Sequence, residues 1–196
     1  MVASVVLIPM TALLLGASFS KHTFSSSSSQ ISIKGSSNLH DWESQVTLFE
    51  GELDFSSSAE GQVSVTTGQL RIDVSSIKSN RGSSIMDKKT FKALAGDDFP
   101  GILFDLKSWT TLSQQGVEFT ALAKGDLTIT DKTSPIQFEV LGTLDDNGSL
   151  TISGEYQLLM SDYGIDAPTA LMGTLKTGDE VTVSFRINSE DRTASN

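Results

Sequence analysis

Apolar residues recur at every second position through most of this chain. In the longest such segment, residues 117–129, one face carries Val, Phe, Ala, Gly, Leu and Ile, while the other carries mainly Glu, Thr, Lys and Asp. The same period of two recurs in residues 70–74, 102–106, 136–140, 150–158 and 181–187. Successive side chains of a strand point to opposite faces, and one dry face with one wet face is typical of antiparallel sheet. The sequence therefore predicts an all-β fold.

Turn residues separate the alternating segments. Asp146-Asn147-Gly148 lies between two of them, and Asn-Gly supplies the positive φ that a tight hairpin requires. About eight strands follow one another through short loops, which is typical of a sandwich or an up-and-down barrel. Several segments are about ten residues long, and this length favours a tilted barrel. We expect a single eight-stranded antiparallel β-barrel.

One segment departs from the period of two. The residues Ser84-Ile85-Met86-Asp87 have the spacing of a capping box with Ser84 as the N-cap. Phe91, Leu94 and Ala95 then fall on one helical face, and Gly96 is a natural stop. The sequence predicts one short amphipathic helix between two strands, placed to close one end of the barrel.

The two ends of the chain differ from its centre. Residues 1–20 are uncharged, contain a short apolar run and end in the small-x-small pattern Ser18-Phe19-Ser20, so they predict a signal peptide and export. The alternative is a buried N-terminal strand or helix. We expect residues 21–30 to form a Ser-rich spacer, residues 31–188 the barrel domain and residues 189–196 a polar tail. Because the chain contains no Cys, a lipoprotein anchor is excluded, and we expect no stable membrane anchor.

Composition excludes several classes of function. The chain has 14 Lys and Arg against 24 Asp and Glu, a net charge of −10, which repels the phosphate backbone of nucleic acids. It has no Cys, and its histidines are His22 and His40, so thiolate nucleophiles, zinc fingers and iron–sulfur clusters are excluded. We predict no catalytic residue, no metal site and no cofactor. A hydrolase or isomerase is a minor alternative, since alternation places most of the strand carboxylates on the wet face; these are Asp105, Asp126, Glu139 and Glu155.

Small residues gather on the apolar face of the longest alternating segment. Ala121, Ala123 and Gly125 are consecutive positions of that face, where Leu or Phe would fill the interior of a barrel. Such a barrel is either packed solid or keeps room for one apolar ligand. The small side chains favour a ligand cavity. The alternative is that Phe104 and Phe138 fill the gap.

Several segments, in order along the chain, resemble the YceI-like family. The resemblance extends from Ile31 to Ile187 and is carried by residues 35–43, 70–77, 86–94, 99–104 and 125–136. Asp131 stands where the family usually has Gly, and Ser134-Pro135 where Lys-Pro is common; both departures lie at a turn. The His40-Asp41-Trp42 opening and the Tyr163–Thr169 loop are similar to a branch of the family from Bacteroidetes-type bacteria.

The resemblance implies an extended lipocalin-like barrel in the periplasm. It also implies a binding or carrier protein, not an enzyme, that holds a long isoprenoid-type lipid in an apolar tunnel, either a polyprenyl phosphate or a quinone-like molecule. A ligand-free envelope-assembly or stress module is the alternative. The sequence leaves the oligomeric state open between a monomer and a homodimer.

Alternation suggests which residues would bind such a lipid. We expect lining residues, small residues that make room, and residues of a rim or lid. The lining residues are Phe104, Leu127, Phe138 and Ile152. The small residues are Ala121, Ala123 and Gly125. The residues of the rim or lid are Trp42, Met86, Phe91, Tyr163 and Leu171. The nearby Lys88, Lys89 and Lys92 either contact an anionic head group or form a solvated helix face.

Overall fold

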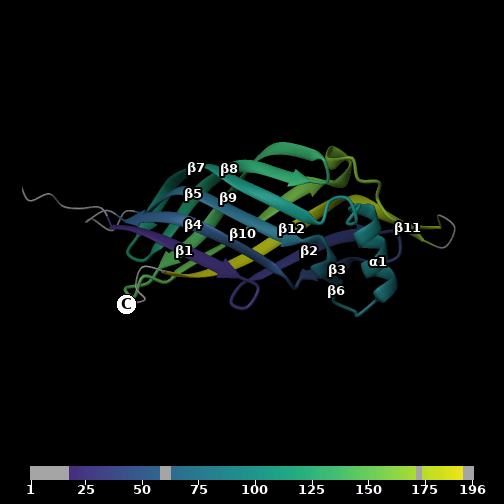
Figure 1. Cartoon of the computed structure of the whole chain (residues 1–196), viewed down its shortest axis with the longest axis horizontal. Coiled ribbons are helices and arrows are strands. Elements are labelled where there is room, and N and C mark those ends of the chain that lie inside the picture. The colour runs from purple at the N-terminus through teal and green to yellow at the C-terminus, as the bar shows by residue number, and fades with distance from the viewer. Residues whose placement is uncertain (1–17, 58–62, 171–173, 192–196) are drawn as a thin grey trace, which may run out of the picture.

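A long antiparallel sheet that curls on itself forms most of the molecule, with one α-helix at one end (Figure 1). The computed structural model describes residues 18–57, 63–170 and 174–191. The elements of these residues are β1 (Ser18–Ser25), β2 (Gln30–Ser37), β3 (Trp42–Val46), β4 (Phe49–Ser57), β5 (Val63–Asp73), the 3-10 helix η1 (Val74–Ser76), β6 (Ile77–Ser79), α1 (Ser84–Ala93), β7 (Gly101–Gln115), β8 (Glu118–Ile129), β9 (Lys132–Leu144), β10 (Leu150–Leu159), the 3-10 helix η2 (Met160–Tyr163), β11 (Thr169–Ala170) and β12 (Leu175–Asp191). The predicted all-β antiparallel fold with one α-helix is confirmed for the described residues.

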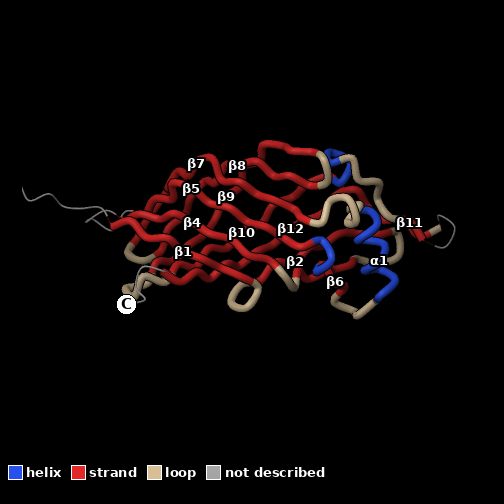
Figure 2. The backbone as a smooth tube through the Cα atoms, in the orientation of Figure 1, coloured by secondary structure: helices blue, strands red, loops and turns tan. Residues whose placement is uncertain are grey.

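The sheet returns to its first strand. Its neighbours follow the order β1-β4-β5-β7-β8-β9-β10-β12, and β12 then pairs with β1 at His22↔Asp191 and Thr23↔Glu190. The earlier part of β12, from Thr177 to Arg186, pairs with β2. β2 in turn pairs with β3, and β3 pairs with β6. The red strands of Figure 2 show this curled, elongated sheet. It encloses an interior that is open toward the end where α1 lies.

The predicted number of eight strands is wrong, because the described residues form twelve. The difference arises where the chain leaves the sheet briefly and then continues in it. Residues 26–29 separate β1 from β2, residues 47–48 separate β3 from β4, and η1 separates β5 from β6. In η1, the Asp73 carboxylate accepts a hydrogen bond from the backbone amide of Ser75 at 2.7 Å. These interruptions are only two to four residues long, so alternation alone does not reveal them.

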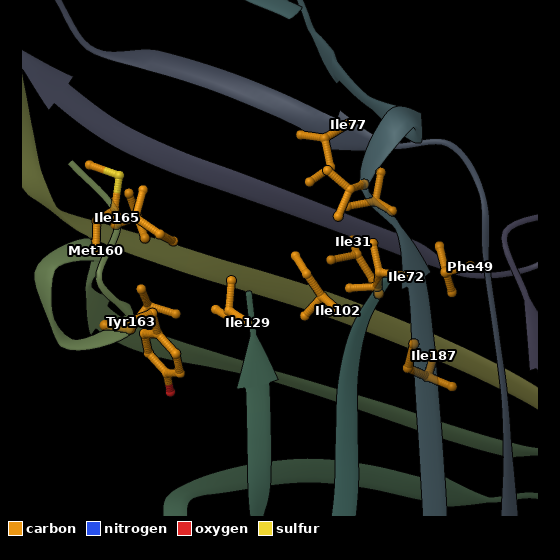
Figure 3. Packing of buried hydrophobic residues seen from close by; sticks show 14 of the residues in the cluster. Ile31, Phe49, Ile72, Ile77, Ile102, Ile129, Met160, Tyr163, Ile165 and Ile187 are labelled. Carbon is orange, nitrogen blue, oxygen red and sulfur yellow. The ribbon is translucent and has the colours of Figure 1, made fainter. Parts of the chain in front are cut away.

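Apolar side chains of the inner face form two clusters. The larger gathers around Ile31, Phe49, Val74 and Tyr163 toward the α1 end (Figure 3). The second gathers around Phe55, Val63, Phe119, Ala121 and Leu150. Full burial of an aliphatic or aromatic side chain contributes about 1.5–3 kcal/mol. The two clusters therefore stabilise both parts of the curled sheet.

The predicted spacer at residues 21–30 is wrong, because this segment belongs to the fold. Phe24 is buried, and His22 is only 1% exposed. The serine run forms the turn after β1, and the Ser29 hydroxyl donates to the carbonyl of Asn188 and accepts from its amide, at 3.2 and 3.0 Å. Serine hydroxyls can bond to nearby backbone groups, so a run that suggests a flexible linker can also be an ordered turn.

The predicted polar tail begins too early. β12 extends to Asp191, and Ser189 is only 2% exposed. The His22 ring connects this end to β1: Nδ1 lies 3.1 Å from the Ser189 hydroxyl, and Nε2 lies 3.0 Å from the Ser20 hydroxyl. The Ser189 hydroxyl donates in turn to the Leu150 carbonyl at 3.2 Å. A buried imidazole with partners on both nitrogens explains why polar residues continue into the sheet here.

The α1 helix forms where predicted, but its cap differs by one residue. Ser83, not Ser84, is the N-cap, and its hydroxyl accepts from the amide of Met86 at 3.3 Å. The Asp87 carboxylate accepts from the amide of Ser79 at 2.7 Å instead of closing a capping box. The helix ends at Ala93, and Gly96 is needed for a different reason: a Cβ there would lie 2.3 Å from the Phe91 ring.

Replacement of Ser83 by Ala should destabilise the protein by about 1 kcal/mol, because it removes the N-cap acceptor of α1. Ser84→Ala is the matched control, since Ser84 is exposed at the first helical position, and we expect it to leave the urea midpoint nearly unchanged. Equal midpoints for the two variants would show that the capping assignment is wrong.

Candidate functional site

A cavity of about 440 Å³ lies inside the curled sheet. Ligand pockets typically measure about 300–1,000 Å³, so this space accommodates one small or elongated molecule. Its wall is built from inward-facing side chains of the strands and from one side of α1. The wall is mostly aliphatic and aromatic, as expected from the dry face of each strand.

Aromatic rings surround the middle of the cavity. Phe138 from β9 lies at the centre, with ring centroids 5.6 Å from Phe104, 6.0 Å from Tyr156 and 5.6 Å from Phe185. All four residues line the cavity. Edge-to-face and tilted ring pairs of this kind add to the energy of burial. The four strands β7, β9, β10 and β12 thus contribute one aromatic wall.

Beyond these rings the interior is filled. Trp109 lines the cavity and packs edge-on against Phe119, with centroids 6.0 Å apart. Phe119 and the fully buried Ala121 belong to the second apolar cluster and do not line the cavity. The cavity is therefore blind at this end, and Trp109 forms part of its floor.

The opposite end is the mouth, formed by α1 and the start of β3. Met86 of α1 and Leu94, which follows the helix, line the cavity together with Trp42. The Trp42 indole donates to the carbonyl of Ser36 at 3.1 Å, and its ring lies so close to Gly35 that a Cβ there would be 2.3 Å away. Trp42 is thus held in place at the mouth by a hydrogen bond and by close packing.

The charged and imidazole side chains of the cavity wall lie at the mouth. Lys89 and His40 both line it, and the Lys89 amine donates to the carbonyl of Thr169. Among the described lining residues there is no Asp or Glu. The carboxylates considered for catalysis lie elsewhere: Asp126 is 3.6 Å from the Lys107 amine in an exposed pair, and Glu155 accepts from the Ser184 hydroxyl at 2.8 Å.

Tyr156 lines the cavity and carries a phenol hydroxyl. Burial raises the pKa of its hydroxyl, and the negative charge of Asp162 raises that pKa further. The phenol is therefore neutral at physiological pH. In the part of the chain that the structure describes, no group of His, Asp or Glu side chains is arranged to hold a metal ion.

Of the residues predicted to make room, one lines the cavity. Ala123 does so, facing Trp109 on β7 and Phe138 on β9 in the strand register. Ala121 lies in the filled cluster, and Gly125 is covered by Phe104, whose ring would lie 2.6 Å from a Cβ at that position. For Gly125, the alternative that a bulky neighbour fills the gap is the one the structure shows.

The other predicted site residues divide between the cavity and its surroundings. Those that line it are Phe104, Leu127, Phe138, Ile152, Trp42 and Met86. Phe91 packs on Gly96 and against the larger apolar cluster, and Tyr163 is buried within that cluster at 2% exposure. Neither lies at the rim. Leu171 is outside the described residues.

Sequence reasoning missed several wall residues. Trp109, Tyr156 and Phe185 line the cavity, and two of them, Tyr156 and Phe185, lie in segments whose alternation is clear. Gly154 is a signal for Phe185, because a glycine inside a strand often marks the close approach of a neighbouring group. Here the Phe185 ring covers Gly154 across the β10–β12 pair. A register shift lies between Leu106 and Ser108, just before Trp109. It interrupts the period of two, so alternation does not assign Trp109 to the inner face.

No helix in the described ranges is long and apolar enough to span a bilayer.

Comparisons with known proteins agree with this architecture. The sequence profile of the YceI-like domain matches residues 22–189. Among solved structures, Burkholderia cenocepacia BcnA is similar with a TM-score of 0.70 and 16% identity, over 85% of this chain and 99% of that one. A polyisoprenoid-binding domain from Saccharophagus degradans, implicated in plant cell wall breakdown, is similar with a TM-score of 0.62 and 12% identity, over 89% of this chain and 99% of that one.

The Campylobacter jejuni YCEI protein shares the fold over 98% of this chain and 93% of its own, with a TM-score of 0.53 and 10% identity. No curated protein matches the sequence significantly. At these identities the structural neighbours establish the fold alone, whereas the domain match covers most of the chain. The chain belongs to the YceI-like family.

Proposed function

We propose that the protein binds a single long-chain, isoprenoid-type lipid in its interior cavity and carries it in the periplasm. The observation that carries the proposal is an apolar cavity that is blind at Trp109 and open at α1. A linear apolar chain fits such a shape, with its tail at the floor and its polar head at the mouth. The similarity in fold to the polyisoprenoid-binding domain from Saccharophagus degradans supports the same class of ligand.

Burial supplies the energy for this binding. Each methylene removed from water contributes about 0.8 kcal/mol, so ten of them contribute about 8 kcal/mol. Part of this is offset by the immobilisation of the chain. Affinity therefore does not depend on polar contacts along the tail. The Phe104, Phe138 and Ile152 side chains would hold the tail, and Lys89 and His40 lie where a polyprenyl phosphate or quinone-like head would emerge.

Mass spectrometry of an organic extract tests the proposal. Protein purified from its native host without detergent should release a lipid whose fragments differ by isoprene units, in about equimolar amount. A clean extract, together with no uptake of an added polyprenyl phosphate or quinone, would contradict it. That result would instead favour a ligand-free envelope module.

Export is the second part of the proposal. We expect the mature chain to begin near Lys21, because residues 1–20 have the properties of a signal peptide. Cleavage there removes Ser20, one hydrogen-bond partner of His22, but leaves the bond to Ser189. N-terminal sequencing of protein from the periplasmic fraction measures the cleavage site. Protein with Met1 intact and confined to the cytoplasm would contradict export.

A further inference from the structure

Two large apolar side chains point into solvent beside the mouth of the cavity. Ile85, in the first turn of α1, is 70% exposed and also lines the mouth. Leu39, in the turn between β2 and β3, is 68% exposed. These are the two most exposed large hydrophobic residues among those described. Single exposed apolar residues are ordinary on protein surfaces, so their position at the opening is the informative feature.

Hydrogen bonds fix the backbone segments that carry Leu39 and Ile85. The Ser37 hydroxyl accepts from the amides of Leu39 and His40 at 3.3 and 3.1 Å. The Asn38 side chain donates to the carbonyl of Thr174 at 2.8 Å and accepts from the amide of Lys176 at 3.0 Å. Leu39 therefore lies at the tip of a turn whose backbone is fixed on both sides. Ile85 is fixed by the capped start of α1.

A contact joins the two elements across the mouth. The Arg81 guanidinium, in the loop before α1, lies 3.4 Å from Nε2 of His40, and Nδ1 of His40 is 2.8 Å from the carbonyl of Asp41. Since a guanidinium donates and a carbonyl accepts, Nε2 of His40 is the acceptor and Nδ1 the donor in these two contacts. Arg81 thereby connects the loop before α1 with the β2–β3 turn that carries Leu39, at the end of the molecule where Figure 1 shows α1, β3 and β6.

The segment that contains α1 is basic, whereas the whole chain is acidic. Residues 77–93 contain the basic residues Lys78, Arg81, Lys88, Lys89 and Lys92 and one acidic residue, Asp87, for a net charge of +4 in a chain of −10. Ile85, Lys88 and Lys92 are spaced by three and four residues, so they share one face of α1. Lys88 and Lys92 are exposed, whereas Asp87 already accepts from the backbone of Ser79.

We propose that this mouth face, comprising Leu39, Arg81, Ile85, Lys88 and Lys92, docks on the surface of an anionic phospholipid bilayer. Leu39 and Ile85 enter the interfacial region, and the basic side chains contact lipid phosphates. The negative charge of the remaining surface is repelled by the same bilayer, so attachment is transient and has one orientation. Docking in this orientation places the open end of the cavity against the lipid.

Vesicle co-sedimentation tests the charge contribution. The mature protein should sediment with vesicles of phosphatidylcholine and phosphatidylglycerol, and weakly with phosphatidylcholine alone. Lys88→Glu/Lys92→Glu should lower the partition coefficient at least about 25-fold, since each basic residue near an anionic surface contributes a factor of about five. The control Lys124→Glu/Arg186→Glu changes net charge equally at exposed positions of β8 and β12 and should have a much smaller effect.

The apolar contribution is tested in the same way. Leu39→Ser/Ile85→Ser should weaken vesicle binding about ten-fold or more, because two side chains lose their burial in the interface. Leu141→Ser removes a similarly exposed apolar side chain, 63% exposed on β9, and should bind as the wild type does. No binding by the wild-type protein, or equal binding by the mouth-face variants and their controls, would overturn the proposal. An acidic protein surface would then be the partner to consider.

Docking on a bilayer goes beyond the proposed lipid binding and does not depend on it. A variant in which the cavity is blocked, Ala123→Phe, should still dock on anionic vesicles. Loss of docking with lipid uptake from detergent solution intact would overturn the docking surface alone. Docking with no lipid in the cavity would overturn the proposed function alone.

Discussion

Replacement of Ala123 by Phe should abolish most lipid binding while leaving the fold stable. Ala123 is 2% exposed on β8 and lines the cavity between Trp109 and Phe138. The added ring displaces about four methylenes of a bound chain, at about 0.8 kcal/mol each, which weakens binding by roughly 200-fold. Titration with a fluorescent polyprenyl probe measures the affinity. Because the ring enters empty space, we expect the free energy of unfolding to stay within about 1 kcal/mol of the wild type.

Ala121→Phe is the matched control for this experiment. Ala121 lies two residues earlier on the same face of β8 and belongs, like Ala123, to the second apolar cluster, but it does not line the cavity. Overpacking a filled core costs about 1–3 kcal/mol. We expect this variant to unfold at lower urea concentration and, where it is folded, to bind the probe. The same outcome for both alanines, whether loss of stability or intact binding, would contradict the assignment of the cavity.

Tyr163→Ala should cost about 3–5 kcal/mol of stability, which is the usual cost of removing a large buried aromatic side chain. Tyr163 is 2% exposed and packs beside Met160 and Ile165 at the end of η2 (Figure 3). Urea unfolding measures the loss. This outcome differs from that of a lid residue, whose removal would change the rate of lipid uptake and leave stability nearly unchanged.

Tyr163→Phe separates the ring from its hydroxyl. Burial of this side chain raises the pKa of the hydroxyl, while a hydrogen bond with Ser134 lowers it. Loss of one buried hydrogen bond typically costs about 0.5–1.5 kcal/mol, so we expect a smaller loss for Phe than for Ala. If Tyr163→Ala were as stable as the wild type, Tyr163 would not be a core residue.

The period of two in the sequence was sufficient to predict the strands and their dry face. Phe119, Ala123 and Ile129 of β8 are buried as the alternation predicts, and Lys124 is exposed. The hairpin turn at residues 145–149 is also confirmed, with Gly148 at a φ of 83°. These features depend on local chemistry, namely side-chain polarity and backbone freedom, and local chemistry is visible in a single sequence.

Features that depend on contacts between distant segments were not predictable in this way. The order of small residues on β8 does not show that Phe104 on β7 covers Gly125, or that Ala121 is enclosed by the filled cluster. The serine run at residues 25–29 is ordered by Asn188, which is far away in the sequence. Which end of the barrel is filled likewise depends on the aromatic rings that meet across its strands.

A crystal structure of the protein purified with its native lipid tests the central claim most directly. We expect continuous density for one chain from the mouth at Met86 to the floor at Trp109, past the rings of Phe104, Phe138 and Phe185. A polar head would emerge beside Lys89 and His40. An interior closed by side chains, or a lipid bound on the outer face of the sheet with the cavity empty, would contradict the proposed function.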